Sequence, residues 1–368
     1  MRIFAATSRY VQGAGVLDEI GPYLLELGTR PAIVADPDVT RLFGSRLQKS
    51  CAAAGAGAEL LTFPGEVTRE AIDSLCARAR EARADVVVGV GGGKGIDTGK
   101  AVARALGTRF VSVPTIASND GPASAAIAVY DAQHRMTEVL HLKRNPDLVL
   151  VDSAVIAAAP IRFLRAGVGD AISKKFEAEA CAAAGAMTLL GAPPSPTGLM
   201  IAEGCYRVLR EHGGEGLRDA QAGRLTEAVE RVIEASVLLS TLSFENAGLS
   251  VAHAIARGIP YVERAARSLH GEHVAYGLLV QLVLENRSQA FYDDILEFYV
   301  DTGLPWRLGM LGLEKPTPAE VREIAAGSML SPSVRRFPQA LTGEALEAAI
   351  QTVETLGRRK TAATPSGH

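Results

Sequence analysis

Apolar and amphipathic segments alternate through the first 150 residues. Continuous apolar runs predict β-strands at 30–36, 58–65, 85–93, 108–115 and 146–152. Apolar residues spaced by three or four positions predict helices after the first two runs, at 39–55 and 68–84. The third run shows no polar alternation, which is typical of a strand buried on both faces. This order of strands and helices predicts a parallel sheet covered by helices.

The pattern changes after Asp152 and is helical almost to the end of the chain. Glycine and proline clusters predict breaks between helices at 191–198, 211–216 and 301–306. We therefore predict an α/β domain at residues 1–159 and an all-α domain at residues 160–368. Residues 125–142 predict a β excursion from the first domain, that is, extended β structure with a turn at Asp131–His134.

The composition fits a compact globular protein, since 48% of the residues are apolar and 21% are charged. A net charge of −3 without a long Lys/Arg run argues against nucleic-acid binding. No apolar signal sequence and no membrane-spanning run is visible. The four cysteines are far apart and form no CxxC pair, which argues against a disulfide scaffold or zinc finger. We expect a cytoplasmic protein that does not bind membranes.

A glycine-rich stretch, GVGGGKGIDTGK at residues 89–100, follows a buried strand. It does not fit the P-loop pattern, because Ala101 follows Gly99–Lys100, and it does not fit the GxGxxG spacing. A helix beginning near Ile96 would still offer free N–H groups and a positive dipole end to a pyrophosphate. A tight strand-to-helix turn without a ligand is the alternative.

Asp36 ends the strand predicted at 30–36. A carboxylate at this position can accept hydrogen bonds from the ribose hydroxyls of a dinucleotide. It can also be the N-cap of the helix that follows. The residue pattern leaves both interpretations open.

Three polar side chains stand out in the helical half. Asp170 follows two glycines in AGVGDAISKKFEA, and His253 and His270 lie beside apolar helical runs. One carboxylate and two imidazoles with an open position form the outline of a Lewis-acid metal site. Because the three lie on different predicted helices, an N-cap aspartate and two core histidines are the alternative.

Five motifs in this order resemble the glycerol dehydrogenase branch of the iron-containing (group III) alcohol dehydrogenases: GVGGGKGIDTGKAVA, VPTIASNDGPASAAIAVY, RNPDLVLVDSAVIAAAPIRFLRAGVGDA, FENAGLSVAHAIARG and HGEHVAYGLLVQL. The resemblance extends from about residue 5 to residue 355. It implies the fold shared with dehydroquinate synthases: a dinucleotide-binding α/β domain, a helical metal-binding domain and a cleft between them.

Matching motif positions imply the site residues. Asp170, His253 and His270 would hold one divalent metal, zinc or alternatively iron. The residues that would bind NAD are Asp36, Gly91, Gly92, Gly93, Lys94, Gly95, Asp97, Thr115, Ser118, Ser124, Ala126 and Tyr130. Asp120 would reach the substrate hydroxyl and, with the metal ligands, complete the catalytic set.

The resemblance also implies an activity, the NAD-dependent and metal-dependent oxidation of glycerol or a related vicinal diol to the hydroxyketone. The metal would lower the pKa of a substrate hydroxyl, and NAD would accept a hydride. His273 is either a proton relay or a helix-surface histidine. Members of the family often form dimers stacked into octamers, so we expect a homo-oligomer with a small polyol as its substrate.

Departures from the family pattern keep other functions open. Gly95 stands where the family commonly has Thr, and Lys174 and Lys175 stand where glycerol dehydrogenases usually carry neutral residues. The two lysines read as solvated surface residues, but a cleft-facing Lys174 would favour an anionic substrate, as in a glycerol-1-phosphate dehydrogenase-like enzyme. A dehydroquinate-synthase-like lyase and a non-catalytic NAD-binding protein are further alternatives.

Overall fold

The computed structural model describes residues 1–130 and 136–363. The predicted turn at Asp131–His134 lies outside the described residues. The structure describes only the backbone of Tyr130, Met136, Thr137 and residues 361–363. The chain forms two compact units. The sheet unit comprises Ala5–Leu164 and Asp219–Thr241, and the helical unit comprises Met1–Phe4, Arg165–Arg218 and the chain from Leu242 onward.

Within the described residues, six strands of the sheet unit form one parallel sheet in the order β1-β8-β5-β4-β2-β3. Their bounds are β1 (Tyr10–Gly13), β2 (Pro31–Ala35), β3 (Glu59–Thr62), β4 (Val86–Gly91), β5 (Arg109–Pro114) and β8 (Leu148–Asp152). The five predicted strands are confirmed. Strand β1 was not predicted, because four half-buried residues at a sheet edge carry too little pattern.

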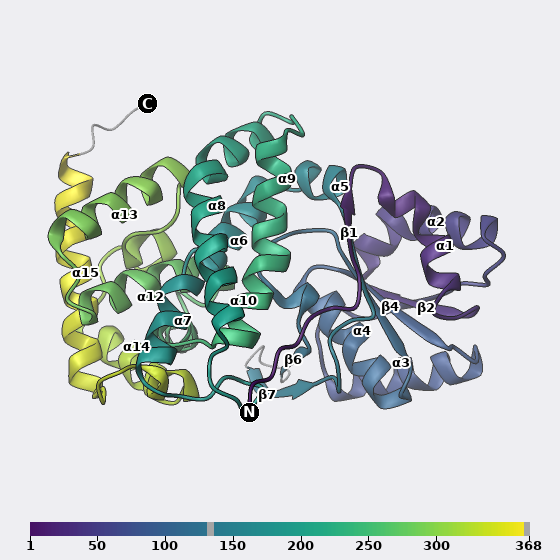
Figure 1. Cartoon of the computed structure of the whole chain (residues 1–368), viewed down its shortest axis with the longest axis horizontal. Helices are drawn as coiled ribbons and strands as arrows, with labels where there is room; N and C mark the ends of the chain where they lie inside the picture. Colours follow the sequence, from purple (N-terminus) through teal and green to yellow (C-terminus); the bar gives the residue numbers. More distant parts are fainter. Residues whose placement is uncertain (131–135, 364–368) are drawn as a thin grey trace. The chain divides into compact units, whose positions relative to one another are not determined.

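Helices cover both faces of the sheet, as Figure 1 shows for α1 and α2 on one side and α3 and α4 on the other. Successive residues of β4 point to opposite layers: Val86 and Val88 pack in the cluster that includes residues of α1 and α2, and Val87 in the one with α3 and α4. The helices of this unit are α1 (Ile20–Leu25), α2 (Pro37–Ala53), α3 (Arg69–Glu81), α4 (Gly93–Leu106), α5 (Ser153–Ala158) and α9 (Glu227–Glu234).

The predicted β excursion is also confirmed. Strands β6 (Ala126–Tyr130) and β7 (Met136–His141) pair antiparallel, with Ala126 opposite His141. They form a separate two-stranded sheet in the described chain.

After Asp152 the described chain is helical, as predicted. Its elements there include α6 (Ile161–Ala171), α7 (Lys174–Ala183), α8 (Pro196–Gln221), α10 (Ser240–Ala247), α11 (Val251–Gly258), α12 (His270–Leu284), α13 (Gln289–Thr302), α14 (Pro318–Met329) and α15 (Gly343–Ala363). Most of α12 is buried, which explains its nearly continuous apolar sequence. No described helix is both long and apolar enough to cross a membrane.

The predicted break at 211–216 is wrong, because α8 continues through these residues. Its glycines serve packing instead. A Cβ atom at Gly213 would lie 3.1 Å from the ring of Phe298, and one at Gly214 would overlap the carboxylate of Asp301. Both partners belong to α13, so the two glycines let the helices approach closely.

Helix α9 packs within the sheet unit although it follows α8 in the chain. The side-chain amide of Gln12 donates to the Glu230 carbonyl oxygen at 2.9 Å, and the Ser153 hydroxyl donates to the Glu230 carboxylate at 2.6 Å. The predicted division between residues 159 and 160 stays a prediction.

Candidate functional site

Asp170 lies in the last turn of α6, so the N-cap interpretation is wrong. The two glycines before it do not lead into a helix; the helix continues through them. A Cβ atom at Gly169 would lie 2.6 Å from the carbonyl oxygen of Gly271, and one at Gly271 would lie 1.9 Å from that of Ala166. Only glycine permits this approach of α6 to the start of α12. The contact brings Asp170 next to His270, the first residue of α12.

His253 projects from α11 and is oriented by the buried carboxylate of Glu177 on α7. Glu177 accepts hydrogen bonds from the backbone N–H groups of Ser250 and His253 at 2.8 and 3.0 Å. It also accepts from His253 Nδ1 at 2.7 Å. Because a carboxylate only accepts, Nδ1 carries a proton and Nε2 is the atom that faces Asp170. A carboxylate behind a histidine in this way is typical of metal sites.

The charges around Glu177 and His253 shift their acidity in opposite directions. Burial opposes ionisation of Glu177, but the nearby His253 ring and Lys174 outweigh it and lower the pKa of the carboxyl to about 2. Burial likewise opposes protonation of His253, but Glu177 and Asp170 raise its pKa to about 9. Glu177 is therefore an ionised hydrogen-bond acceptor across the physiological pH range.

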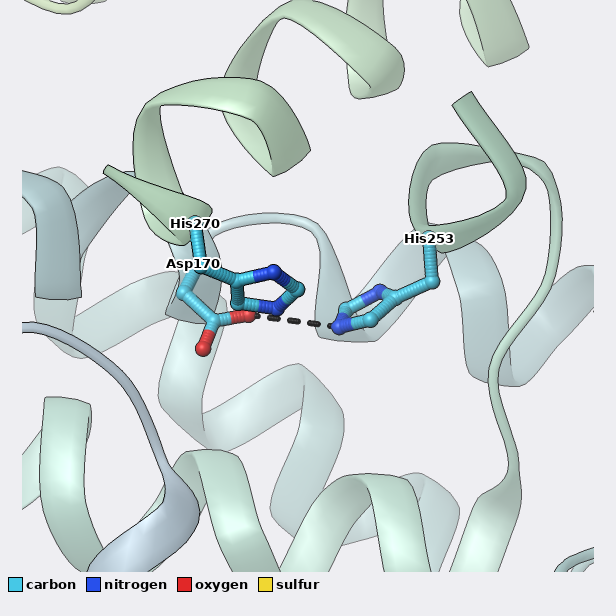
Figure 2. A group of neighbouring side chains, drawn as sticks. All are labelled: Asp170, His253 and His270. Atoms are coloured by element: carbon cyan, nitrogen blue, oxygen red, sulfur yellow. Dashed lines mark ion pairs between the residues drawn. The ribbon is translucent and has the colours of Figure 1, made fainter. Parts of the chain in front are cut away.

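Asp170, His253 and His270 come together although they lie on three helices. Their ligand atoms all lie within 4.8 Å of one another, and Figure 2 shows the side chains pointing toward a common space. Two atoms about 2.1 Å from a tetrahedral zinc ion are separated by about 3.4 Å. Asp170 Oδ1 and His253 Nε2 are 3.4 Å apart. Asp170 is buried whereas His270 is exposed, so the donor set fits three protein ligands with an open position.

Lys174, the first residue of α7, is not a solvated surface lysine. Its side chain is fully buried, and its ammonium lies 2.5 Å from Asp170 Oδ1 and 3.2 Å from His253 Nε2. It also lies over the ring of Phe244. Burial opposes ionisation of Asp170, but the adjacent ammonium holds the pKa of the carboxyl well below its usual range.

Of two further residues near the cluster, Lys175 agrees with its predicted surface position and His273 does not. Lys175 is partly exposed and forms ion pairs with Glu179 and Glu203, close to the surface interpretation. His273 is buried instead of lying on the helix surface. Its Nε2 is 3.2 Å from the Ala265 carbonyl oxygen, and burial lowers its pKa to about 4. The proton-relay role stays a prediction.

The glycine stretch forms the turn between β4 and α4. Helix α4 begins at Gly93, three residues before the predicted start near Ile96, with Gly92 as its N-cap. Gly91 has a φ of 135°, and a Cβ atom at Gly95 would lie 2.6 Å from the Val90 carbonyl oxygen. The first backbone N–H groups of the helix therefore belong to residues without bulky side chains, apart from Lys94. This arrangement is suited to an approaching anion.

Charged side chains around the turn are engaged with the protein. Lys94 forms an ion pair with Glu66. The carboxylate of Asp97 accepts a hydrogen bond from the Ala128 N–H at 3.1 Å and lies 3.5 Å from the buried Lys100 ammonium. Asp97 therefore connects α4 to β6, and its contact with NAD stays a prediction.

Asp36 is the N-cap of α2, where its carboxylate accepts a hydrogen bond from the Val39 N–H at 2.8 Å. The capping interpretation is therefore confirmed. The contact with a ribose stays a prediction, because one carboxylate oxygen suffices for the cap.

The remaining predicted residues belong to the segment after β5. Thr115 donates its N–H to the Gly91 carbonyl oxygen at 3.0 Å. Asp120 is buried, and its carboxylate accepts from the Ser240 hydroxyl at 3.0 Å. Lys100 donates to the Ala126 carbonyl oxygen at 2.8 Å and lies 3.4 Å from the Ser124 hydroxyl. Ser118 is half-buried, and Tyr130 ends β6 with its side chain outside the description.

Sequence reasoning missed Glu177 as a site residue. Its spacing of seven residues from Asp170 was the available signal, although the two residues lie on separate helices, α6 and α7. The signal was weak, since the run of lysines and glutamates resembles an exposed helix face.

A parallel sheet with a glycine turn and an Asp/His/His cluster are features expected of a metal-dependent dehydrogenase that uses a dinucleotide. Comparison with known proteins agrees. Residues 7–153 match the family model described as iron-containing alcohol dehydrogenase. The chain is 38% identical to glycolaldehyde reductase of Halobacterium salinarum and 37% identical to glycerol dehydrogenase of Escherichia coli, each over 97% of this chain and 98% of the relative.

A solved structure of a probable glycerol dehydrogenase from Sinorhizobium meliloti aligns with a TM-score of 0.92 at 38% identity, over 98% of this chain and all of that one. The chain therefore belongs to the iron-containing alcohol dehydrogenase family, in its glycerol dehydrogenase branch, and is an oxidoreductase. The predicted fold class and family are confirmed.

Proposed function

We propose that this enzyme oxidises a vicinal diol, with glycerol as the first candidate, to the hydroxyketone, using NAD and one divalent metal. The observation that carries the proposal is the cluster of Asp170, His253 and His270, whose ligand atoms lie within 4.8 Å of one another. Relatives at similar identity are named for glycerol and for glycolaldehyde. Glycolaldehyde carries a hydroxyl beside its carbonyl group, like the hydroxyketone that forms from a vicinal diol. Both names therefore support the same substrate class.

Zinc is the metal that we propose, with iron as the alternative. When bound, the metal would supply Lewis-acid polarisation of a substrate oxygen. Asp170, His253 and His270 would hold it, and two imidazoles with one carboxylate are a donor set that zinc accepts. Glu177 would keep the His253 ring oriented by accepting its Nδ1 proton, as it does at 2.7 Å.

The sheet unit would bind NAD. The backbone N–H groups at the start of α4 would receive the pyrophosphate, aided by the helix dipole. The free lone pairs of the Asp36 carboxylate would accept from the adenosine ribose while the residue caps α2. The segment from Thr115 to Tyr130 would line the nicotinamide half, and buried Asp120, held by Ser240, would orient a substrate hydroxyl.

The contacts of Lys175 support an uncharged substrate over a phosphorylated one. The ammonium of Lys175 forms ion pairs with Glu179 and Glu203. A lysine that already faces a carboxylate offers less net positive charge to a phosphate. The same observation gives no support to a lyase that must bind several anionic groups.

We further propose a cytoplasmic homo-oligomer, a dimer or an octamer. The family resemblance supports the assembly. All four cysteines are buried and none forms a disulfide, which suits a reducing compartment. Size-exclusion chromatography with light scattering tests the assembly directly.

Metal removal and a substrate panel test the function. We expect the zinc-loaded enzyme to produce NADH from glycerol and 1,2-propanediol but not from glycerol 1-phosphate, as followed at 340 nm. Removal of the metal should abolish turnover, and zinc should restore it. His253→Ala should lose zinc and turnover together while NAD still binds, and His212→Ala, a partly exposed histidine on α8, is the matched control. Full activity of a verified metal-free enzyme would refute the proposal.

A further inference from the structure

The Lys174 ammonium lies among the atoms proposed to bind the metal. Its Nζ is 2.5 Å from Asp170 Oδ1 and 3.2 Å from His253 Nε2, and those two atoms are 3.4 Å apart. The side chain of Lys174 is fully buried, as is that of Asp170. The lysine therefore holds a positive charge beside the proposed metal ligands Asp170 and His253, where water does not screen it.

An ammonium and a divalent cation do not fit these atoms together. A zinc ion about 2.1 Å from both Oδ1 and Nε2 would lie within about 3.5 Å of Nζ, wherever it stood around the axis that joins them. Two positive charges this close in a buried site repel strongly. The Lys174 side chain must therefore withdraw from Asp170 when the metal binds.

We propose that Lys174 is an internal competitor for the metal, an inference that rests on the metal site of the proposed function. The lysine offsets the charge of buried Asp170 and keeps it beside His253 while no cation is bound. Metal binding must displace this interaction. The apparent affinity is then the intrinsic affinity reduced by the fraction of molecules in which the lysine has withdrawn.

The neighbouring Lys175 provides a matched control. It lies one position further along α7 and is also held by carboxylates, but these are Glu179 and Glu203. Its side chain is 21% exposed, whereas that of Lys174 is fully buried. Substitution of Lys175 removes an equal charge from the same helix without touching Asp170.

The test compares the zinc affinity of metal-stripped wild type, Lys174→Met and Lys175→Met, by competition with a chromophoric chelator at one pH. Methionine is unbranched and of similar length, so it keeps the packing on Phe244. We expect Lys174→Met to bind zinc at least about tenfold more tightly than wild type. This factor corresponds to a wild type in which the lysine has withdrawn in about one molecule in ten. Lys175→Met should stay within about twofold, because surface charges act weakly.

Thermal unfolding gives a second measurement that does not depend on turnover. Metal-stripped Lys174→Met should unfold at a lower temperature than wild type, since Asp170 loses its buried partner. Saturating zinc should raise its Tm by more than it raises that of wild type. Should Lys174→Met fail to fold, Lys174→Gln repeats the comparison and should shift the zinc affinity in the same direction.

The outcomes separate this inference from the proposed function. Equal zinc affinity in wild type and Lys174→Met would overturn the competition but leave the metal site standing. Weaker binding by Lys174→Met would also overturn it, because the lysine nitrogen would then be a ligand. Failure of all three proteins to take up zinc would refute the metal site and the inference with it.

Discussion

The two regions of this molecule that carry its predicted chemistry are built in different ways. The β4–α4 turn is a local structure, in which consecutive residues from Gly89 to Gly99 bring backbone groups together. The Asp/His/His cluster is a tertiary structure, because its members lie up to 100 residues apart on α6, α11 and α12. A local site depends on backbone shape, whereas an assembled site depends on how separate helices pack. Substitutions should therefore affect the two regions independently.

Asp170→Asn should have the largest effect. Asparagine keeps the shape but loses the charge that binds a cation, so turnover should fall at least about a thousandfold. It also leaves the buried Lys174 without its carboxylate, and the free energy of unfolding of the metal-stripped protein should fall by about 3–5 kcal/mol. Zinc binding, NADH production and chemical denaturation measure these effects. NAD binding should persist in the folded fraction, and Asp293→Asn, at an exposed position of α13, is the control.

Glu177→Gln should reduce zinc affinity by about 10–100-fold, because the amide no longer offers a charged acceptor to His253 Nδ1. Chelator competition measures the change, and NAD affinity should be unaltered. Glu179→Gln lies on the same helix but is partly exposed, and it should have little effect. An unchanged zinc affinity in Glu177→Gln would show that the negative charge of Glu177 is not needed, because the glutamine amide oxygen can still accept from Nδ1.

Gly95→Ala tests the local region. The new Cβ atom would lie 2.6 Å from the Val90 carbonyl oxygen, so α4 must shift away from β4. We expect a loss of about 1–3 kcal/mol in the free energy of unfolding and weaker NAD binding. Zinc affinity should stay the same, and a matching loss of zinc affinity would contradict the independence of the two regions. Gly57→Ala, which meets no atom within 4 Å, is the control.

Substitutions of Asp36 should have the smallest effect and separate its two roles. Asp36→Ala should cost about 1 kcal/mol through the lost N-cap of α2. Asp36→Asn keeps the cap, so its stability should change by less than about 0.5 kcal/mol. Weaker NAD binding by Asp36→Asn at normal stability would support the ribose contact. Unchanged NAD binding in both variants would restrict Asp36 to capping.

Much of the fold could be predicted from the sequence. Most strands of the sheet are buried, and each of these appears in the sequence as a continuous run of apolar residues. The start of α4 was placed three residues late, since glycine has a poor helix propensity and was assigned to the loop. The glycines of α8 and α6 were misread for the same reason. In both helices the glycine lets another helix approach, and this depends on a partner that is distant in the chain.

By itself, the sequence determined the order of strands and helices, the glycine turn at the end of β4 and the identity of three candidate metal ligands. These features depend on local periodicity and on the chemistry of single side chains. Only the tertiary structure decided that Asp170, His253 and His270 meet, that Glu177 orients His253 and that Lys174 is buried among them. The physical reason is that helix packing sets the distances between these groups, and packing depends on the whole chain at once.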